Sequence, residues 1–320
     1  MTKLFIIGNG FDLAHGMKTR YLDFKNYLIK KYGINDNLID GIWADIPESY
    51  QLPDGGEEYD NQVAGAAIIR ILDNTEGEQW KDVETSLGVL DYSEFLDNYD
   101  MNSKNDDDNF DNNDNDFDEL YRNEDNAKNL CGALQLVYGY FQDWVKTVKI
   151  SKKIIPNFQD LISPENDLFL NFNYTRTLEK LYNAQNVCHI HGTQDDEIFF
   201  GHGNDEDRTE YFQNNWIGAE WELNKLQLAL RKDTNKAYNK NAHFFKEIEK
   251  TANKGNLEIY SFGFSFSEVD MIYLKEIFRR INTNDVIFHL NDFEKKEQQD
   301  EYINILKDCG FEGNIHRSFK

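Results

Sequence analysis

Short apolar segments that alternate with helical patterns constrain the fold of this chain more than any other feature. Between them, segments such as 177–183 and 270–280 repeat apolar residues at helical spacing. Short buried strands that alternate with helices are typical of a parallel sheet covered by helices. The sequence therefore predicts an α/β fold, with a Rossmann-like, mainly parallel sheet. The predicted strands span residues 3–7, 168–173, 187–191, 257–262 and 286–291.

Residues 60–165 carry a different pattern. A long helix is predicted over 130–148, and it follows a stretch rich in Asp and Asn at 97–126. Residues 91–126 contain 14 acidic and two basic residues, which contribute −12 to the net charge of −24. Such a stretch buries too little apolar surface to fold by itself. We expect a single domain over 1–320, in which 60–165 forms a helical insertion with an acidic, solvated loop at 97–126.

Composition and charge exclude several classes of protein. The apolar run Leu4–Ile7 is too short for a secretion signal, and no segment has the length and apolarity of a membrane span. Cys131, Cys188 and Cys309 are far apart, so they indicate neither a disulfide framework nor a thiolate zinc site. A net charge of −24 repels nucleic-acid phosphates. We expect a cytoplasmic protein that contacts neither membrane nor nucleic acid directly, although a local pocket for a small nucleotide is compatible with this charge.

Four of the predicted strands end in polar clusters. Ligands of open parallel sheets bind outside the carboxyl ends of the strands, so we expect these clusters to form one site. Gly8 and Gly10 suit a tight turn at which a phosphate approaches backbone N–H groups. Leu13 occupies the third glycine position of the G-x-G-x-x-G pattern, which leaves a plain turn as the alternative. The clusters are Gly8-Asn9-Gly10-Phe11-Asp12, Asn171-Phe172-Asn173-Tyr174, His189-Ile190-His191-Gly192 and Gly263-Phe264-Ser265.

Single residues in these clusters have more than one interpretation. Asp12 can hold a ribose hydroxyl or cap a helix, and Asn173 can bind a ligand or close a turn. His189 and His191 are two residues apart, on one face of the predicted strand, as acid–base groups or metal ligands would be. Together with His202, Asp12 and Asn173 they are also the ligand types of a metal-dependent phosphoesterase or nuclease. Against that alternative, the sequence has no second aspartate cluster to bridge two metals.

The motifs together resemble one family. The segment from Leu4 to Tyr21 closely resembles the start of the bacteriophage abortive infection AbiH family, and further motifs match in order as far as residue 270. The resemblance implies anti-phage defence, but it assigns no role to Trp80 or Glu84. The further motifs are Trp80-Lys81-Asp82-Val83-Glu84, Asn171-Phe172-Asn173-Tyr174-Thr175, Ile190-His191-Gly192, Phe200-Gly201-His202 and Gly263-Phe264-Ser265.

More distantly, the chain is similar to sirtuin-like NAD-binding domains. Their loop has two glycines one residue apart and a third six positions on, a spacing that Gly8, Gly10 and Gly16 match. The similarity implies an NAD pocket in which Asn173 and His191 are the catalytic pair. The cofactor-binding residues that it implies are Gly8, Asn9, Gly10, Phe11, Asp12, Gly16, Gly263, Ser265 and Asn291.

Two positions depart from the sirtuin-like pattern. Asp12 stands where a small hydroxyl residue is usual, and Thr175 stands where an Asp often follows the Asn. The zinc-binding cysteine module of sirtuin deacetylases is absent, so we expect neither deacetylation nor a bound metal. The resemblance implies hydrolysis of NAD⁺ to nicotinamide and ADP-ribose, with low resting activity that a phage-derived activator or homo-oligomer formation raises. The alternative is a non-catalytic, nucleotide-sensing module.

Overall fold

The computed structural model describes residues 2–42, 46–74, 80–97, 115–255, 257–291 and 295–317. The chain divides into two compact units. The sheet unit comprises residues 1–19, 145–199 and 233–320, and the helical unit comprises residues 20–144 and 200–232. The predicted insertion at 60–165 overlaps the helical unit over residues 60–144.

Six parallel strands form the sheet of the sheet unit, within the residues that the structure describes. All five pairings between neighbouring strands are parallel. The strand order β5-β4-β1-β6-β7-β8 is the order typical of dinucleotide-binding sheets, with its switch point between β1 and β6. The predicted Rossmann-like fold is therefore confirmed. The strands are β1 (Thr2–Ile7), β4 (Leu168–Asn171), β5 (Asn186–His189), β6 (Leu257–Phe262), β7 (Ile287–Leu290) and β8 (Asn314–His316).

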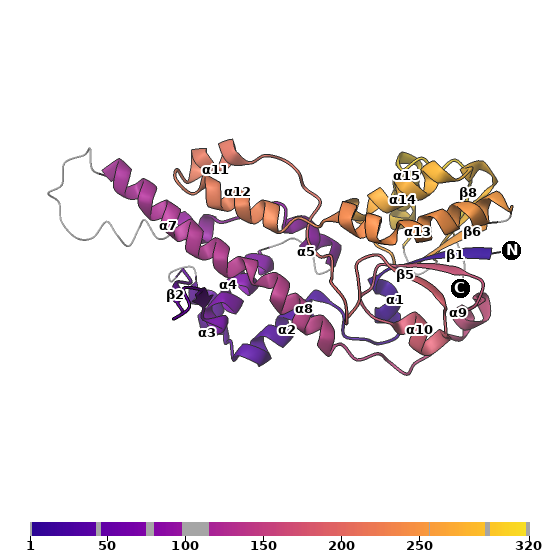
Figure 1. The fold of residues 1–320 in the computed structure, drawn as a ribbon, viewed down its shortest axis with the longest axis horizontal. Coiled ribbons are helices and arrows are strands. Elements are labelled where there is room, and N and C mark those ends of the chain that lie inside the picture. The colour runs from indigo at the N-terminus through magenta and orange to yellow at the C-terminus, as the bar shows by residue number, and fades with distance from the viewer. Residues whose placement is uncertain are drawn as a thin grey trace. The chain divides into compact units, whose positions relative to one another are not determined.

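Helices cover both faces of this sheet, as Figure 1 shows. Leu4 and Ile6 of β1 face one core and Phe5 and Ile7 the other, and all four side chains are fully buried. Burial on both faces explains why the strand is an uninterrupted apolar run. The first core is covered by α13 (Thr234–Asn253), α14 (Met271–Arg280) and α15 (Lys296–Asp308), and the second by α1 (Asn9–Ala14), α9 (Pro156–Leu161) and α10 (Thr177–Tyr182). Short 3₁₀ turns span Glu268–Asp270 and Thr283–Asp285.

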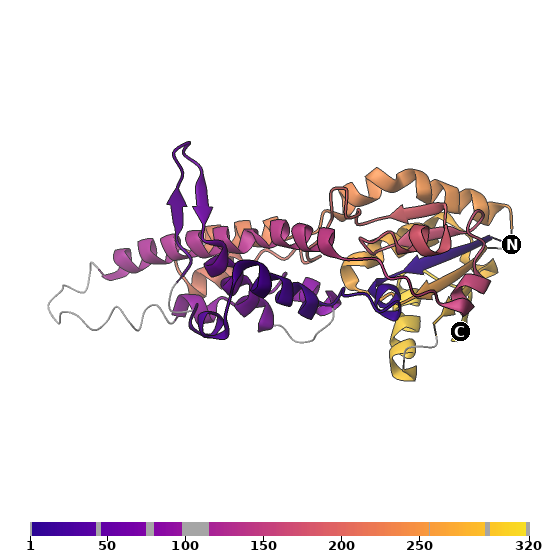
Figure 2. The same cartoon turned by 90° about the horizontal axis from the view of Figure 1, so that it is seen from below.

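The helical unit consists of helices and one hairpin, which Figure 2 shows projecting from the helices of this unit. Its helices have ordinary boundary signals. Helix α2 ends at Gly33, whose φ of 68° is left-handed, and α4 begins after Asp60, whose carboxylate accepts from the N–H of Gln62 at 2.7 Å. The elements are α2 (Tyr21–Tyr32), α3 (Asp36–Gly41), β2 (Ser49–Gln51), β3 (Glu57–Tyr59), α4 (Asn61–Asp73), α5 (Trp80–Ser86), α7 (Asn115–Gln135), α8 (Val137–Thr147), α11 (Thr209–Asn215) and α12 (Glu220–Ala229).

The acidic stretch differs in part from the prediction. Residues 98–114 lie outside the described residues, but residues 115–126 form the first turns of α7 instead of a loop. The side chain of Asn123 donates to the carbonyl oxygen of Ile217 at 3.1 Å, and Ala127 on the next turn is fully buried. Tertiary contacts of this kind stabilise helix that composition alone assigns to solvent.

Two further differences concern boundaries. The helix predicted over 130–148 is divided, because α7 ends at Gln135 and α8 begins at Val137. Strands β2, β3 and β8 are not predicted, since three residues carry too little pattern. No helix in the described part of the chain is long and apolar enough to cross a membrane.

Candidate functional site

The predicted polar clusters meet at one edge of the sheet. Strands β5, β4, β1 and β6 are direct neighbours, and Ile7, the last residue of β1, pairs with Asn171 on β4 and Phe262 on β6. On the other side of β4, Asn171 pairs with His189, the last residue of β5. Because these strands are parallel and in register, the residues that follow them emerge at the same carboxyl edge. The expectation that these clusters lie on neighbouring strand ends is confirmed.

The glycines at this edge allow two loops to pack backbone against backbone. The N–H of Gly8 donates to Phe262 at 3.0 Å, and the N–H of Gly10 donates to Gly263 at 2.9 Å. A Cβ atom on Gly8 would lie 2.4 Å from the carbonyl oxygen of Gly263, and one on Gly10 would lie 2.6 Å from its Cα. The glycines therefore allow the loops after β1 and β6 to make direct backbone contact at the switch point. Since these two N–H groups are used within the loops, the predicted phosphate contact stays a prediction.

Other residues of the predicted cofactor set hold this loop in place. The side chain of Asn9 donates to the carbonyl oxygen of Thr19 at 3.0 Å. The ring of Phe11 is fully buried and packs edge-on against Phe158 and Phe262, with centroids 4.9 and 5.3 Å away. Gly16, with a φ of 75°, follows α1. The structure thus gives Asn9 a hydrogen-bonding role and Phe11 a packing role beside the site.

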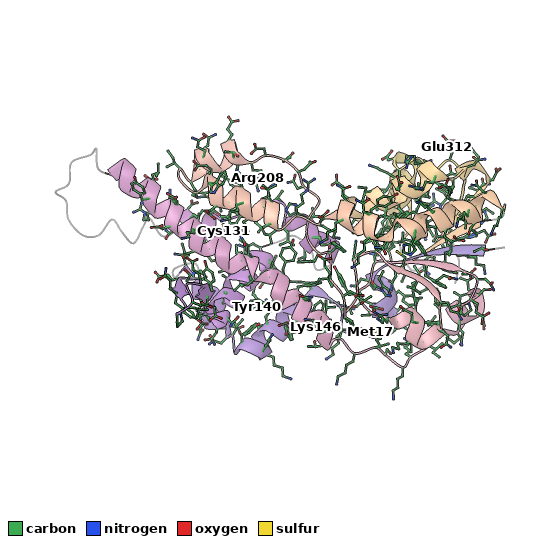
Figure 3. All side chains as sticks on the ribbon, viewed as in Figure 1. Met17, Cys131, Tyr140, Lys146, Arg208 and Glu312 are labelled. Atoms are coloured by element: carbon green, nitrogen blue, oxygen red, sulfur yellow. The ribbon has the colours of Figure 1, made fainter. Side chains whose placement is uncertain are left out.

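Asp12 is the centre of a buried network of hydroxyl groups. Its carboxylate accepts from Thr175 at 2.5 Å and from Thr177 at 2.8 Å, and the two hydroxyl oxygens are 3.0 Å apart. Thr177 also lies 3.5 Å from the sulfur of Met17, a residue labelled in Figure 3. Asp12 and Thr175, the two positions noted in the sequence analysis, are therefore the two partners of one hydrogen bond.

Burial raises the pKa of Asp12 from 3.8 to about 6, against the opposing effects of both threonine hydrogen bonds and the charge of His189. The folded state thus binds this proton more tightly than the unfolded chain. The contribution of Asp12 to stability is greatest at low pH and is lost as the pH rises through about 6. The loss amounts to about 3 kcal/mol at most.

Replacement of Asp12 by Asn removes this dependence. Relative to wild type, Asp12→Asn is expected to gain up to about 3 kcal/mol of unfolding free energy between pH 4 and pH 8. Urea denaturation at both pH values measures the gain. Asp160→Asn, at an exposed position on α9, serves as the control. An equal pH response of the Asp12 and Asp160 variants contradicts the assignment.

Asn173 is buried just beyond the end of β4. Its side-chain amide donates to the carbonyl oxygen of Gly8 at 3.0 Å, and its own N–H donates to the side chain of Asn171 at 3.0 Å. Because the amide of Asn173 crosses to the end of β1, it joins the β1 and β4 loops next to the switch point. Asn173 is thus close to the glycine loop, as the NAD-pocket prediction requires.

His191 is paired with a carboxylate that sequence analysis does not identify. Its Nε2 lies 3.1 Å from Oδ1 of Asp270, and the side chains of both residues are almost wholly buried, at 4% and 7% exposure. The oxygen is not in line with the N–H, so the contact is close but poorly aligned. Such alignment is common in catalytic sites without substrate. The sequence feature that could have identified Asp270 is its position, directly before the helix that follows strand β6.

The two histidines do not share a face, which corrects the expectation from their spacing. His191 packs edge-on against Phe172, with ring centroids 5.2 Å apart, and Phe172 belongs to the core under α13 and α14. His189 instead contacts Glu179 of α10, on the opposite face. Strand β5 ends at His189, and Gly192 follows with a φ of 84°. The two-residue period of a strand therefore does not extend to His191.

The last two predicted contacts lie on the other half of the sheet. Ser265 is partly buried in the loop after β6. Asn291 directly follows β7, and its carbonyl oxygen accepts from Gln299 at 3.1 Å. Strand β7 is separated from β1 by β6. Both residues thus follow strands on the β6 side of the switch point.

Two motifs of the helical unit meet around a buried lysine. Nζ of Lys232 lies 2.7 Å from Glu84 on α5, and the side chains are 0% and 11% exposed. The backbone N–H of Lys232 donates to the carbonyl oxygen of His202 at 2.9 Å, and the His202 ring is held by the carbonyl oxygen of Gln227 at 2.8 Å. Glu84 is therefore one half of a buried ion pair, and His202 positions the other half. The side chain of Trp80 lies outside the described residues.

A parallel sheet of this strand order, with glycine turns and buried Asn and His side chains at its carboxyl edge, defines a Rossmann-like α/β protein. The chain belongs to the bacteriophage abortive infection AbiH family, whose sequence profile matches residues 4–292. Searches among curated proteins and among solved structures find no significant match. The resemblance to the AbiH family is confirmed, and it identifies the chain as an abortive infection protein.

Proposed function

We propose that this chain binds NAD⁺ at the carboxyl edge of its sheet and hydrolyses it to nicotinamide and ADP-ribose. The observation that carries the proposal is the placement of two buried polar side chains, Asn173 and His191, at the ends of the adjacent strands β4 and β5. Asp270 lies beside His191, so a proton acceptor and its orienting carboxylate are present together. Ligand binding at a strand-order switch is the general behaviour of this kind of sheet.

The reaction breaks the bond between C1′ of the nicotinamide ribose and N1 of the nicotinamide ring. The bond's electron pair leaves with the neutral nicotinamide, and an oxocarbenium-like centre develops at C1′. Asn173 orients a water molecule or the nicotinamide ribose, and the water oxygen forms the new bond to C1′. His191 accepts the water proton as general base and releases it to solvent. The carboxylate of Asp270 stabilises the imidazolium that forms, in the manner of a catalytic triad.

The remaining predicted residues contact the rest of the nucleotide. The turn containing Gly8, Asn9 and Gly10 approaches the pyrophosphate, and Ser265 and Asn291 contact the adenosine half. Asp12 accepts hydrogen bonds from Thr175 and Thr177 and so holds their side chains in place. Asp12 and Thr175 are hydrogen-bonded to each other, so under this proposal they support the site together.

The test measures NAD⁺ in cells before and after phage infection, with nicotinamide and ADP-ribose quantified by liquid chromatography and mass spectrometry. Wild type is expected to lose NAD⁺ after infection and release both products. His191→Ala and Asn173→Ala are expected to slow this release by about 100-fold or more. His243→Ala, at an exposed position on α13, controls for the loss of a histidine and should match wild type.

Two outcomes distinguish the alternatives. If NAD⁺ stays constant in infected wild-type cells while NAD⁺ raises the melting temperature of the purified protein, the chain is a binding module and hydrolysis is wrong. If NAD⁺ causes no thermal shift either, the NAD pocket itself is wrong.

A further inference from the structure

His189 is held between two hydrogen-bond acceptors. Its Nε2 lies 2.8 Å from Oε1 of Glu179, and its Nδ1 lies 3.1 Å from the carbonyl oxygen of Asn173. The ring is largely buried, with 9% of the side chain exposed, and Glu179 is 26% exposed. The side-chain amide nitrogen of Asn171 lies 3.4 Å from the same Nδ1. The His189 ring thus connects Glu179 of α10 with the turn that contains Asn173.

The charges around this pair are consistent with that arrangement. Burial raises the pKa of Glu179, but the hydrogen bond and charge of His189, a backbone hydrogen bond and the charge of Arg176 together outweigh burial, and the resulting pKa is below its ordinary value. His189 also lowers the pKa of a second carboxylate, Asp12. The pair therefore lies in a small charged cluster on one face of the sheet, beside the Asn173 turn.

The backbone of Asn173 is fixed on both sides. Asn171 accepts from its N–H at 3.0 Å, and His189 contacts its carbonyl oxygen at 3.1 Å. With both peptide groups held, the side-chain amide is directed to the carbonyl oxygen of Gly8. Asn171 belongs to β4, so its position follows from the sheet. The backbone of His189 likewise belongs to the sheet, at the end of β5, but its ring also contacts Glu179 of α10. This second support can therefore be weakened by substitution of Glu179.

We infer that Glu179 and His189 are positioning residues that hold the Asn173 carbonyl and thereby fix the direction of the Asn173 side chain. The inference rests on the proposed function, because that function gives Asn173 its role in the reaction. Neither residue needs to touch the nucleotide. Loss of either one should impair the orientation of the reacting groups more than the binding of NAD⁺.

The experiment combines kinetics with amide hydrogen exchange on the full chain. His189→Ala is expected to lower kcat for NAD⁺ hydrolysis by about 100-fold, with KM changed less than about threefold. Amide exchange in peptides covering residues 171–175 is expected to accelerate. Added imidazole should partly restore kcat and partly slow this exchange. Glu179→Gln keeps the shape of the side chain without its charge, and it should show the same changes to a smaller extent.

The chain offers a matched control in His289 on β7, whose Nε2 lies 3.5 Å from Glu258 on β6. His289→Ala removes a similarly buried histidine next to a carboxylate, so it should leave kcat and the exchange of residues 171–175 unchanged. Unaltered exchange at 171–175 in folded His189→Ala and Glu179→Gln overturns the positioning role. If exchange at 171–175 is faster in the two variants but wild type never cleaves NAD⁺, the positioning role is supported and the proposed reaction is refuted. If His189→Ala does not fold, Glu179→Gln decides by the same two readouts.

Discussion

Gly263→Ala is expected to lower the unfolding free energy of the sheet unit by about 2–5 kcal/mol. Gly263 has a φ of 60°, which costs a residue with a Cβ about 1–2 kcal/mol. The new Cβ would also lie 2.3 Å from the backbone nitrogen of Phe11 and 2.5 Å from the carbonyl carbon of Gly10. Both neighbours are backbone in the β1 loop, so neither can swing away as a flexible side chain would. Overpacking of this kind costs about 1–3 kcal/mol more.

The control for this substitution is Gly255→Ala in the same unit. Gly255 has a φ of 81°, and a Cβ at this position would meet no heavy atom within 4 Å. It therefore carries the conformational cost without the collision, and its loss should stay near about 1–2 kcal/mol. Urea denaturation of both variants gives the difference. Equal losses would show that the two loops separate easily, and the close packing at the switch point would then have no energetic importance.

Glu84→Ala is expected to destabilise the helical unit by about 3–5 kcal/mol. The substitution removes the carboxylate 2.7 Å from a lysine whose side chain is 0% exposed. The ammonium group then loses its principal compensating charge in a buried position, and the desolvation cost that the pair had offset is no longer balanced. Thermal and urea denaturation measure the loss.

A double-mutant cycle separates the ion pair from packing. Lys232→Met keeps the volume of the side chain and removes the charge, so the double variant Glu84→Ala, Lys232→Met should be much closer to wild type than Glu84→Ala alone. Additive losses in the cycle would contradict a direct interaction. If the double variant instead regains the stability lost in Glu84→Ala, the role of Glu84 is to balance the buried charge of Lys232. The Phe200-Gly201-His202 motif, which contacts Lys232 through His202, would then belong to the same structural core of the helical unit.

These experiments separate structural motifs of the AbiH family from those that carry chemistry. The Gly8, Gly10 and Gly263 positions are required by backbone packing, and Glu84 by charge balance. Substitutions at these positions should abolish phage defence through loss of the fold. His191→Ala and Asn173→Ala should abolish it while leaving the melting temperature within a few degrees of wild type, provided the proposed reaction holds.

The sequence alone determined five of the six strands in the described sheet, and the edge at which its polar residues gather. The mainly apolar segments 4–7 and 257–262 are local signals, since a strand buried on both faces needs apolar residues at most of its positions. Parallel strands have a common carboxyl edge, so the polar residues that follow them must lie near one another. The positions of Asn173 and the glycine turns could thus be predicted without coordinates.

The tertiary structure alone decided which side chains become partners. Asp12 and Thr175 are 163 residues apart in sequence, and no local pattern records that they share a hydrogen bond. The same holds for Asp270 beside His191 and for Lys232 beside Glu84. The end of β5 at His189 also placed the two histidines on opposite faces, although their spacing suggested one. Periodicity reports only which face of a regular element a residue occupies, whereas pairing between distant residues depends on how the elements pack.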